Sequence, residues 1–180
     1  METLRTARLT LIPLTLDLLR AAVREPAEVG KVLGVRIVPG WPNAEEMGLF
    51  PWLAGAMERD PGLVEWGQTI VIHDADRALI GTAGFKGGPD ETGTVEIGYG
   101  VVPSYQGCGY ATEAVAALIA WAFAHEQVAR VYADCLPDNR ASARVLTKLG
   151  LRQLPPSGEL LHWELRRPDW QAQRSDWGKR

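Results

Sequence analysis

A glycine-rich turn at residues 106–111 is the part of the sequence whose residue types and spacing could most directly do chemistry. It reads Gln-Gly-Cys-Gly-Tyr-Ala, follows an apolar run that ends at Val102, and precedes a helical pattern that begins at Tyr110. Glycine lets the backbone turn sharply and lets a ligand come close to the main chain. The first turn of a helix offers unpaired N–H groups and the positive end of the helix dipole. This combination predicts a phosphate-binding site.

Other interpretations of the same turn remain open at this point. Glycines between a strand and a helix also serve as plain tight connections. A Walker loop requires Gly-Lys followed by Ser or Thr, and no such lysine follows the turn. The dinucleotide fingerprint G-x-G-x-x-G is nearly met by Gly107 and Gly109, with Thr112 in the third place and Asp134 further on. That fold needs further strand–helix units, and the thirty residues after Gly150 are too few to build them.

The cysteines and histidines favour neither covalent nor metal chemistry. Cys108 lies in the turn and Cys135 at the end of a later strand, but no histidine is close in sequence to activate either thiol. Two cysteines are too few for a disulfide framework, and the three histidines are scattered without metal-ligand spacing. We therefore expect no metal and no acyl-enzyme.

The composition narrows the range of partners. A chain of 180 residues fits one domain, and its 46% apolar and 23% charged residues are ordinary for a globular protein. No stretch approaches the roughly 18 apolar residues of a membrane helix, and the start of the chain does not resemble a secretion signal. A net charge of -3 is unfavourable for neutralising nucleic-acid phosphates. We expect a cytoplasmic protein that binds neither nucleic acid nor membrane.

The elements that position the turn can be predicted from periodicity and caps. Asn43 is expected to cap a helix, with Glu46 at the reciprocal position of the capping box. Four helices are predicted at residues 15–25, 43–59, 110–125 and 140–149, with a short one at 28–33. Seven strands are predicted at residues 8–13, 66–73, 78–85, 94–102, 130–135, 151–154 and 160–166. The expected fold class is α/β (α+β), with one mixed, mostly antiparallel sheet in a single domain over residues 1–167 and a loose polar tail at 168–180.

The turn and its neighbours together resemble a known family. Gln106, Gly109 and Ala111 stand at the defined positions of Q/R-x-x-G-x-G/A, the pyrophosphate-binding motif of the GNAT superfamily of acyl-CoA-dependent N-acyltransferases. Residues 96–99 before the turn and 139–150 after it stand in the family's order and resemble the ribosomal-protein N-terminal acetyltransferase (RimJ/RimL-like) branch. The specific similarity covers about residues 80–151. It implies a single GNAT-type domain that uses acetyl-CoA.

The resemblance also implies which residues bind coenzyme A. The strand edge at Val101 and Val102 would pair with the pantetheine arm. Asn139 would bond the pantetheine amides, although a plain helix-capping role is equally compatible with its position. The pyrophosphate would be held by the backbone of the turn, that is Gln106, Gly107, Cys108, Gly109, Tyr110, Ala111 and Thr112.

Glu96 is the candidate general base that the resemblance implies. On a strand over residues 94–102, Glu96 shares one face with Gly98 and Gly100. Two glycines on one face suggest that the acyl arm, the acceptor or a packed helix comes close there. Glu96 would accept the proton that the attacking amine releases. An ion-paired strand glutamate is the alternative interpretation.

The usual acid of the family is missing from this sequence. Many GNAT enzymes place a tyrosine seven residues after the asparagine to protonate the leaving thiolate, and here that position holds Leu146. Ser142 lies on the apolar side of its predicted helix and would donate a hydrogen bond to the coenzyme sulfur, as the resemblance implies.

The acceptor is expected to be an amine, either of a small molecule or of a protein N-terminus, and a homodimer is left open. The acceptor pocket would come from the N-terminal half, where Trp41, Trp52 and Trp66 could line it or pack in the core. A non-catalytic acyl-CoA-binding module is the alternative function, suggested by the absent tyrosine.

Overall fold

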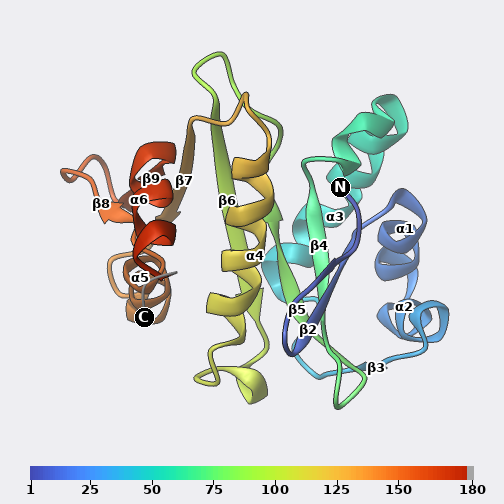
Figure 1. Ribbon diagram of the computed structural model, residues 1–180. Helices are drawn as coiled ribbons and strands as arrows, with labels where there is room; N and C mark the ends of the chain where they lie inside the picture. Colours follow the sequence, from blue (N-terminus) through green and yellow to red (C-terminus); the bar gives the residue numbers. More distant parts are fainter. Residues whose placement is uncertain (178–180) are drawn as a thin grey trace.

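The computed structural model describes residues 1–177, which form one sheet with helices on both faces (Figure 1). The nine strands found in this range lie in the order β1-β2-β4-β5-β6-β7-β9-β8, and β3 pairs beside β5. Their bounds are β1 (Leu4–Arg5), β2 (Leu9–Pro13), β3 (Arg36–Ile37), β4 (Gln68–His73), β5 (Ala78–Phe85), β6 (Thr94–Val101), β7 (Arg130–Cys135), β8 (Arg152–Gln153) and β9 (Leu161–Arg166). The pairs β6–β7 and β3–β5 are parallel, and the other neighbours are antiparallel.

Six α-helices occur within the same residues, together with short 3-10 turns at Pro61–Val64 and Pro103–Tyr105. The helices are α1 (Leu16–Arg24), α2 (Pro26–Leu33), α3 (Ala44–Arg59), α4 (Tyr110–Ala124), α5 (Arg140–Lys148) and α6 (Arg167–Trp177). None of them is both long and apolar enough to cross a membrane.

The central strands are covered on both faces, which explains why every residue of β5 is buried. On one face Thr82 of β5 donates a hydrogen bond to Glu46 of α3. On the other face Phe85 packs against Trp121 of α4, with ring centroids 5.8 Å apart. Alternate side chains of one strand therefore reach two different helical layers.

The strands β6 and β7 pair only at their beginnings. Thr94–Glu96 lie opposite Arg130–Tyr132, whereas within residues 1–177 the residues 97–101 of β6 pair with β5 and not with β7. Beyond Glu96 the two strands diverge (Figure 1). This separation leaves the outer backbone edge of β6 facing the space in which the candidate site lies.

The predicted fold class is confirmed, and two details differ from the expectation. The two-residue strands β1 and β3 add to the predicted seven, because elements this short carry no periodicity. The loose tail predicted at residues 168–180 is wrong for the part that the structure describes, which belongs to α6. Arg167 donates to the backbone carbonyls of Phe123, His125 and Val128, and Trp170 packs on Phe123. These contacts dock α6 at the end of α4. The remainder, residues 178–180, lies outside the described residues.

Candidate active site

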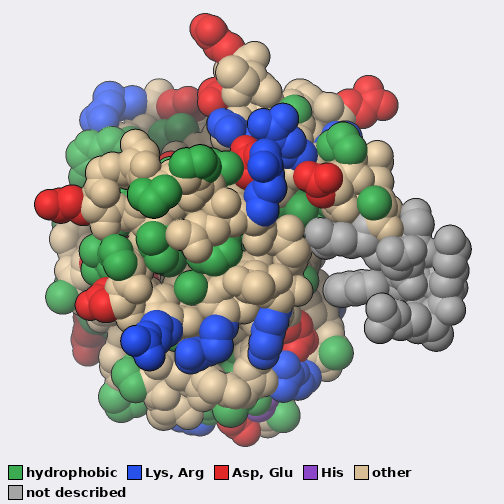
Figure 2. All heavy atoms as spheres, turned by 90° about the vertical axis from the view of Figure 1, so that its left-hand side faces the viewer, with side chains coloured by type: hydrophobic (Ala, Val, Ile, Leu, Met, Phe, Trp, Pro, Cys, Tyr) green, Lys and Arg blue, Asp and Glu red, His purple; other side chains and the backbone are tan. Residues whose placement is uncertain are grey.

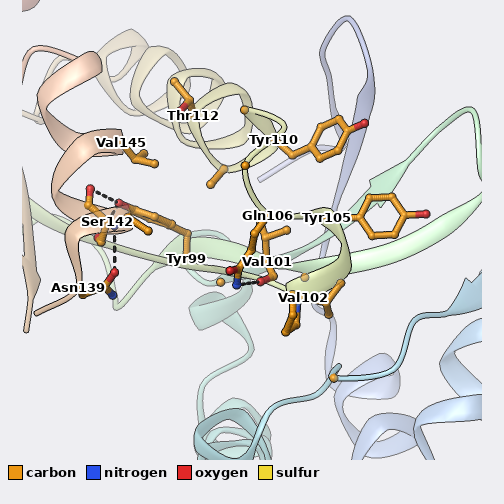
Figure 3. Close-up of a pocket in the computed structure, with 18 of the residues that line it drawn as sticks. Tyr99, Val101, Val102, Tyr105, Gln106, Tyr110, Thr112, Asn139, Ser142 and Val145 are labelled. Atoms are coloured by element: carbon orange, nitrogen blue, oxygen red, sulfur yellow. Dashed lines mark hydrogen bonds between the residues drawn. The ribbon is translucent and has the colours of Figure 1, made fainter.

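A cavity of about 640 Å³ opens where β6 and β7 diverge (Figure 3). Its lining comes from five parts of the chain. They are the segment before and within the start of α3, Gly81 of β5, the second half of β6 with the residues that follow it, the turn at residues 106–112 except Cys108, and α5 with Asn139 before it. The predicted turn and the predicted helix at residues 140–149 are thus brought to one site.

The turn has the geometry of an anion-binding loop. Gly107 and Gly109 have φ angles of 76° and 83°, a left-handed conformation that favours glycine. A Cβ atom on Gly107 would meet no atom within 4 Å, so the backbone there is open to a ligand. Gly109 is the N-cap of α4, and no side chain caps this helix end. Its first N–H groups therefore face the cavity ready for a phosphate, and the residues present fit coenzyme A.

One end of the turn is bonded to the strand that precedes it. The side-chain amide of Gln106 donates a 2.8 Å hydrogen bond to the carbonyl of Val101 (Figure 3). Gln106 therefore orients the turn rather than pointing away from it. Val101 and Val102 line the cavity beside it, as the predicted pantetheine edge requires.

Arg8 supports the turn from outside the cavity. Its guanidinium lies 4.5 Å from the centre of the Tyr110 ring and donates to the carbonyl of Cys108 at 3.1 Å. It also pairs with Glu113 at 2.7 Å. Burial acts to raise the pKa of Glu113, but hydrogen bonds from Thr6 and Arg8 outweigh it and hold this pKa below its ordinary value. The charged pair thus fixes the first turn of α4 to the start of β2.

A polar chain links both ends of the turn to the β4–β5 hairpin. The Tyr105 hydroxyl donates to Asp76 at 2.6 Å, and Nδ1 of the buried His73 lies 3.1 Å from the same carboxylate. The other nitrogen of His73 is 3.0 Å from the Tyr110 hydroxyl. No local pattern in the sequence indicates these contacts, because the residues come from β4, a hairpin turn and the two sides of the glycine turn.

Tyr99, Asn139 and Ser142 line a part of the cavity that we call the thiol end, because Ser142 is the predicted partner of the coenzyme sulfur (Figure 3). The Tyr99 hydroxyl lies 2.8 Å from Oγ of Ser142, and burial raises the pKa of Tyr99 to about 12. Asn139 caps α5 by accepting a 3.0 Å hydrogen bond from the Ser142 N–H, so the capping interpretation of Asn139 is confirmed. Its side-chain NH₂ group is not used in that bond. Leu146 is fully buried and does not line the cavity, whereas Tyr99, which sequence reasoning missed as a site residue, does.

Another part of the lining, which we call the Glu46 end, is formed by Gly40, Trp41, Asn43, Glu46 and Gly100. The predicted capping box is present, because Asn43 accepts from the Glu46 N–H at 2.9 Å and Glu46 accepts from the Asn43 N–H at 2.7 Å. Burial raises the pKa of Glu46 above its ordinary value, with a smaller contribution from the charge of Glu45. Hydrogen bonds from Thr82 and Asn43 act in the opposite direction. The result is a carboxylate held beside the cavity in partly desolvated surroundings.

Glu96 lies outside the lining of this cavity. It does share a face of β6 with Gly98 and Gly100: a Cβ on Gly98 would lie 3.7 Å from the side chain of Lys86, which also pairs with Glu96. The Nζ of Lys86 is 3.7 Å from Asp134 as well. The ion-paired alternative for Glu96 is therefore what the structure contains, and its role as a base stays a prediction.

The tryptophans and cysteines considered in the sequence analysis lie in different parts of the fold. Trp41 and Trp66 are buried in the core, Trp52 is 65% exposed, and only Trp41 of the three lines the cavity. Cys108 is exposed in the turn and Cys135 is buried. Within residues 1–177 no group of three or more His, Cys, Asp or Glu side chains could hold a metal ion.

Basic side chains line the same cavity as the glycine turn. Helix α5 carries the exposed residues Arg144 and Lys148, which both line the cavity. Figure 2 shows the face that includes α5, β8 and β9, on which Lys and Arg side chains gather in two groups. Positive charge beside an uncapped helix N-terminus suits a ligand with several phosphate groups.

Comparison with known proteins gives the class to which this site belongs. The model of the Acetyltransferase (GNAT) domain family matches residues 8–152. The uncharacterized N-acetyltransferase YjdG of Bacillus subtilis is 34% identical over 163 residues, which cover 91% of this chain and 97% of that protein. The uncharacterized N-acetyltransferase YnaD of the same bacterium is 42% identical over 84 residues, or 47% of this chain and 48% of YnaD. The chain belongs to the GNAT acetyltransferase family, whose acetyl donor is acetyl-CoA.

Solved structures share the fold over nearly the whole chain. The ribosomal-protein-S5-alanine acetyltransferase from Vibrio fischeri superimposes with a TM-score of 0.62 at 17% identity, covering 93% of this chain and 98% of that one. RimJ of Mycobacterium smegmatis, in complex with CoA-disulfide, superimposes with a TM-score of 0.61 at 19% identity, covering 89% and 83%. The family resemblance in the sequence is therefore confirmed, and RimJ is among the structural neighbours.

Proposed function

We propose that the chain acetylates a primary amine by direct attack of that amine on acetyl-CoA while both are bound. The observation that carries this proposal is that one cavity is lined both by an anion-binding turn and by Glu46. Donor and acceptor can therefore meet inside a single space, without transfer through an acyl-enzyme. Within residues 1–177 no histidine forms a hydrogen bond with the exposed Cys108, which supports direct transfer.

We assign the binding of the acetyl donor, acetyl-CoA, to residues of the turn, of β6 and of α5. The backbone of residues 106–112 would hold the pyrophosphate, with Arg144 and Lys148 adding positive charge. Val101, Val102 and the free NH₂ of Asn139 would hold the pantetheine arm. The bound cofactor supplies a thioester whose sulfur leaves as a thiolate. Ser142 would donate a hydrogen bond to that thiolate, and the neighbouring Tyr99, protonated at neutral pH, would position the serine hydroxyl.

A protein N-terminus is the acceptor that we favour over a small-molecule amine. Two supports are the names of the fold neighbours, which are ribosomal-protein acetyltransferases, and the low pKa of an α-amine, near 8, compared with about 10.4 for lysine. An α-amine needs little help to reach its neutral, nucleophilic form. Glu96, the general base predicted from the sequence, remains a candidate for accepting the proton of the amine.

The experiment that tests this function has two steps. Thermal unfolding with and without acetyl-CoA should show stabilisation at concentrations well above micromolar, since a ligand that binds the native state raises its stability. Release of free thiol is then followed with peptides of different N-terminal residues and with a set of small amines. Binding of acetyl-CoA without turnover on any amine would favour the non-catalytic module instead.

A further inference from the structure

We propose that the carboxylate of Glu46 is the group that accepts the proton from the acceptor amine, so that the acceptor binds at the Trp41–Glu46 end of the cavity. This inference rests on the proposed acetyl transfer to an amine. It assigns a catalytic role to a residue whose sequence context predicts only a helix cap.

The carboxylate is fixed in place from two sides. Glu46 is the third residue of α3, and its Oε2 accepts the Asn43 N–H while its backbone N–H bonds back to the Asn43 side chain. Its Oε1 accepts a hydrogen bond from Thr82. Thr82 pairs with Gly100 across β5 and β6, and Gly100 lines the cavity. The carboxylate therefore lies over Thr82 of β5, next to the position in β6 that has no side chain.

The same carboxylate has capacity left for a ligand. An ionised carboxylate offers about four lone-pair positions, and the two bonds described use two of them. Within residues 1–177 no lysine or arginine forms an ion pair with Glu46, although both Glu96 and Glu113 have one. An acceptor amine is a donor that would complete the set of bonds.

The surroundings also suit proton transfer at neutral pH. Burial raises the pKa of Glu46, and a general base works best when its pKa approaches the pH of operation.

The step balances with the groups present. The neutral amine nitrogen forms a bond to the thioester carbonyl carbon, and the carbon–sulfur bond breaks with its electron pair on sulfur. The proton that the nitrogen releases passes to Glu46, and the thiolate leaves toward the Ser142 hydroxyl on the opposite face of β6. The products are an amide, coenzyme A thiolate and a protonated Glu46, which returns its proton to solvent.

Glu46→Gln and Glu96→Gln form a matched pair for the test. The carbonyl oxygen of glutamine at residue 46 can still accept the Asn43 N–H, and its NH₂ group can donate to the Thr82 hydroxyl oxygen, so the capping box and the fold are kept. We expect Glu46→Gln to lower kcat for the best amine by about 10²–10⁴-fold, the usual range for removing a general base. Glu96→Gln should cost less than about tenfold, and neither variant should change the Kd for acetyl-CoA or lower the Tm.

The outcomes separate the two proposals. Wild-type protein that binds acetyl-CoA and acetylates no amine overturns both of them. An active wild type with a Glu46→Gln variant of equal kcat overturns this inference alone. A larger loss in Glu96→Gln than in Glu46→Gln also overturns it and returns the base to Glu96.

Discussion

Replacing Gly100 with alanine should slow acetyl transfer and at the same time stabilise the fold. Gly100 lies in β6 and lines the cavity at the Glu46 end. A Cβ atom at this position would lie 3.8 Å from Nδ2 of Asn43, which is an ordinary contact, and the backbone there is not left-handed. Alanine therefore fits the folded backbone without strain, although its methyl group enters the space that we assign to the acceptor.

The two effects have magnitudes that can be stated separately. Alanine at an unstrained glycine position stabilises a protein by about 0.4–1 kcal/mol, because it restricts the unfolded chain. At about 2–4 °C per kcal/mol for a chain of this size, the Tm should rise by roughly 1–4 °C. A misplacement of about 1 Å between reacting groups can cost on the order of 100-fold in rate. We expect kcat/KM for the amine to fall by at least about tenfold.

Gly98→Ala is the matched control for this substitution. Gly98 lies on the same face of the same strand, its added Cβ would lie 3.7 Å from Cε of Lys86, and it is outside the cavity lining. Thermal unfolding should show a similar gain in Tm for both variants, while thiol release should be slowed only in Gly100→Ala, with the Kd for acetyl-CoA unchanged. Wild-type kcat/KM in Gly100→Ala would refute the assignment of the acceptor to this end of the cavity.

Three further predictions concern the other parts of the site. Tyr99→Phe removes the hydroxyl beside Ser142 and should lower kcat by about tenfold, a loss of about 1.4 kcal/mol in transition-state stabilisation, with little change in KM for acetyl-CoA. An unchanged kcat would refute the role of Tyr99 in positioning Ser142. Gly109→Val forces a branched residue into a left-handed conformation that costs about 1–2 kcal/mol and should abolish the stabilisation by acetyl-CoA in thermal unfolding, whereas retained stabilisation would place the pyrophosphate elsewhere. At neutral pH the free energy of unfolding of Glu46→Gln should exceed that of the wild type. The folded wild type binds the proton of Glu46 more tightly than the unfolded chain does. The stability of the wild type therefore falls as pH rises from 4.5 through the raised pKa of Glu46. Chemical denaturation across this pH range measures the difference, which should vanish below pH 4.5.

Much of the scaffold was predictable because its signals are local. The strand at residues 94–101, the glycine turn and α4 follow from periodicity and from glycines whose φ is positive in the structure. The capping box of Asn43 and Glu46 was also visible as a spacing of three residues. By contrast, α6 consists largely of polar residues, and it is docked by bonds from Arg167 to a distant helix end that no local pattern contains.

The thiol end and the Glu46 end of the cavity were less predictable, since each depends on the packing of segments that are distant in sequence. The alternation of a strand puts Tyr99 on the face opposite Glu96, but its contact with Ser142 depends on how α5 packs beside β6. Glu46 looks like a cap in sequence, and its place at the cavity depends on the packing of α3 over Thr82. The Lys86 side chain, which occupies the space over Gly98, likewise has no signal in the sequence around Glu96.

Where β6 diverges from β7, the cavity has parts that differ in how much amino-acid substitution can alter them. The proposed donor half relies largely on main-chain atoms, along the open edge of β6 and in the turn, which side-chain substitutions do not remove. The proposed acceptor half consists mainly of side chains in the short stretch from residue 40 to residue 46. Substitutions in that stretch can alter which amine is accepted while the cofactor is still held. Libraries of variants that aim to retarget this scaffold should therefore be concentrated there.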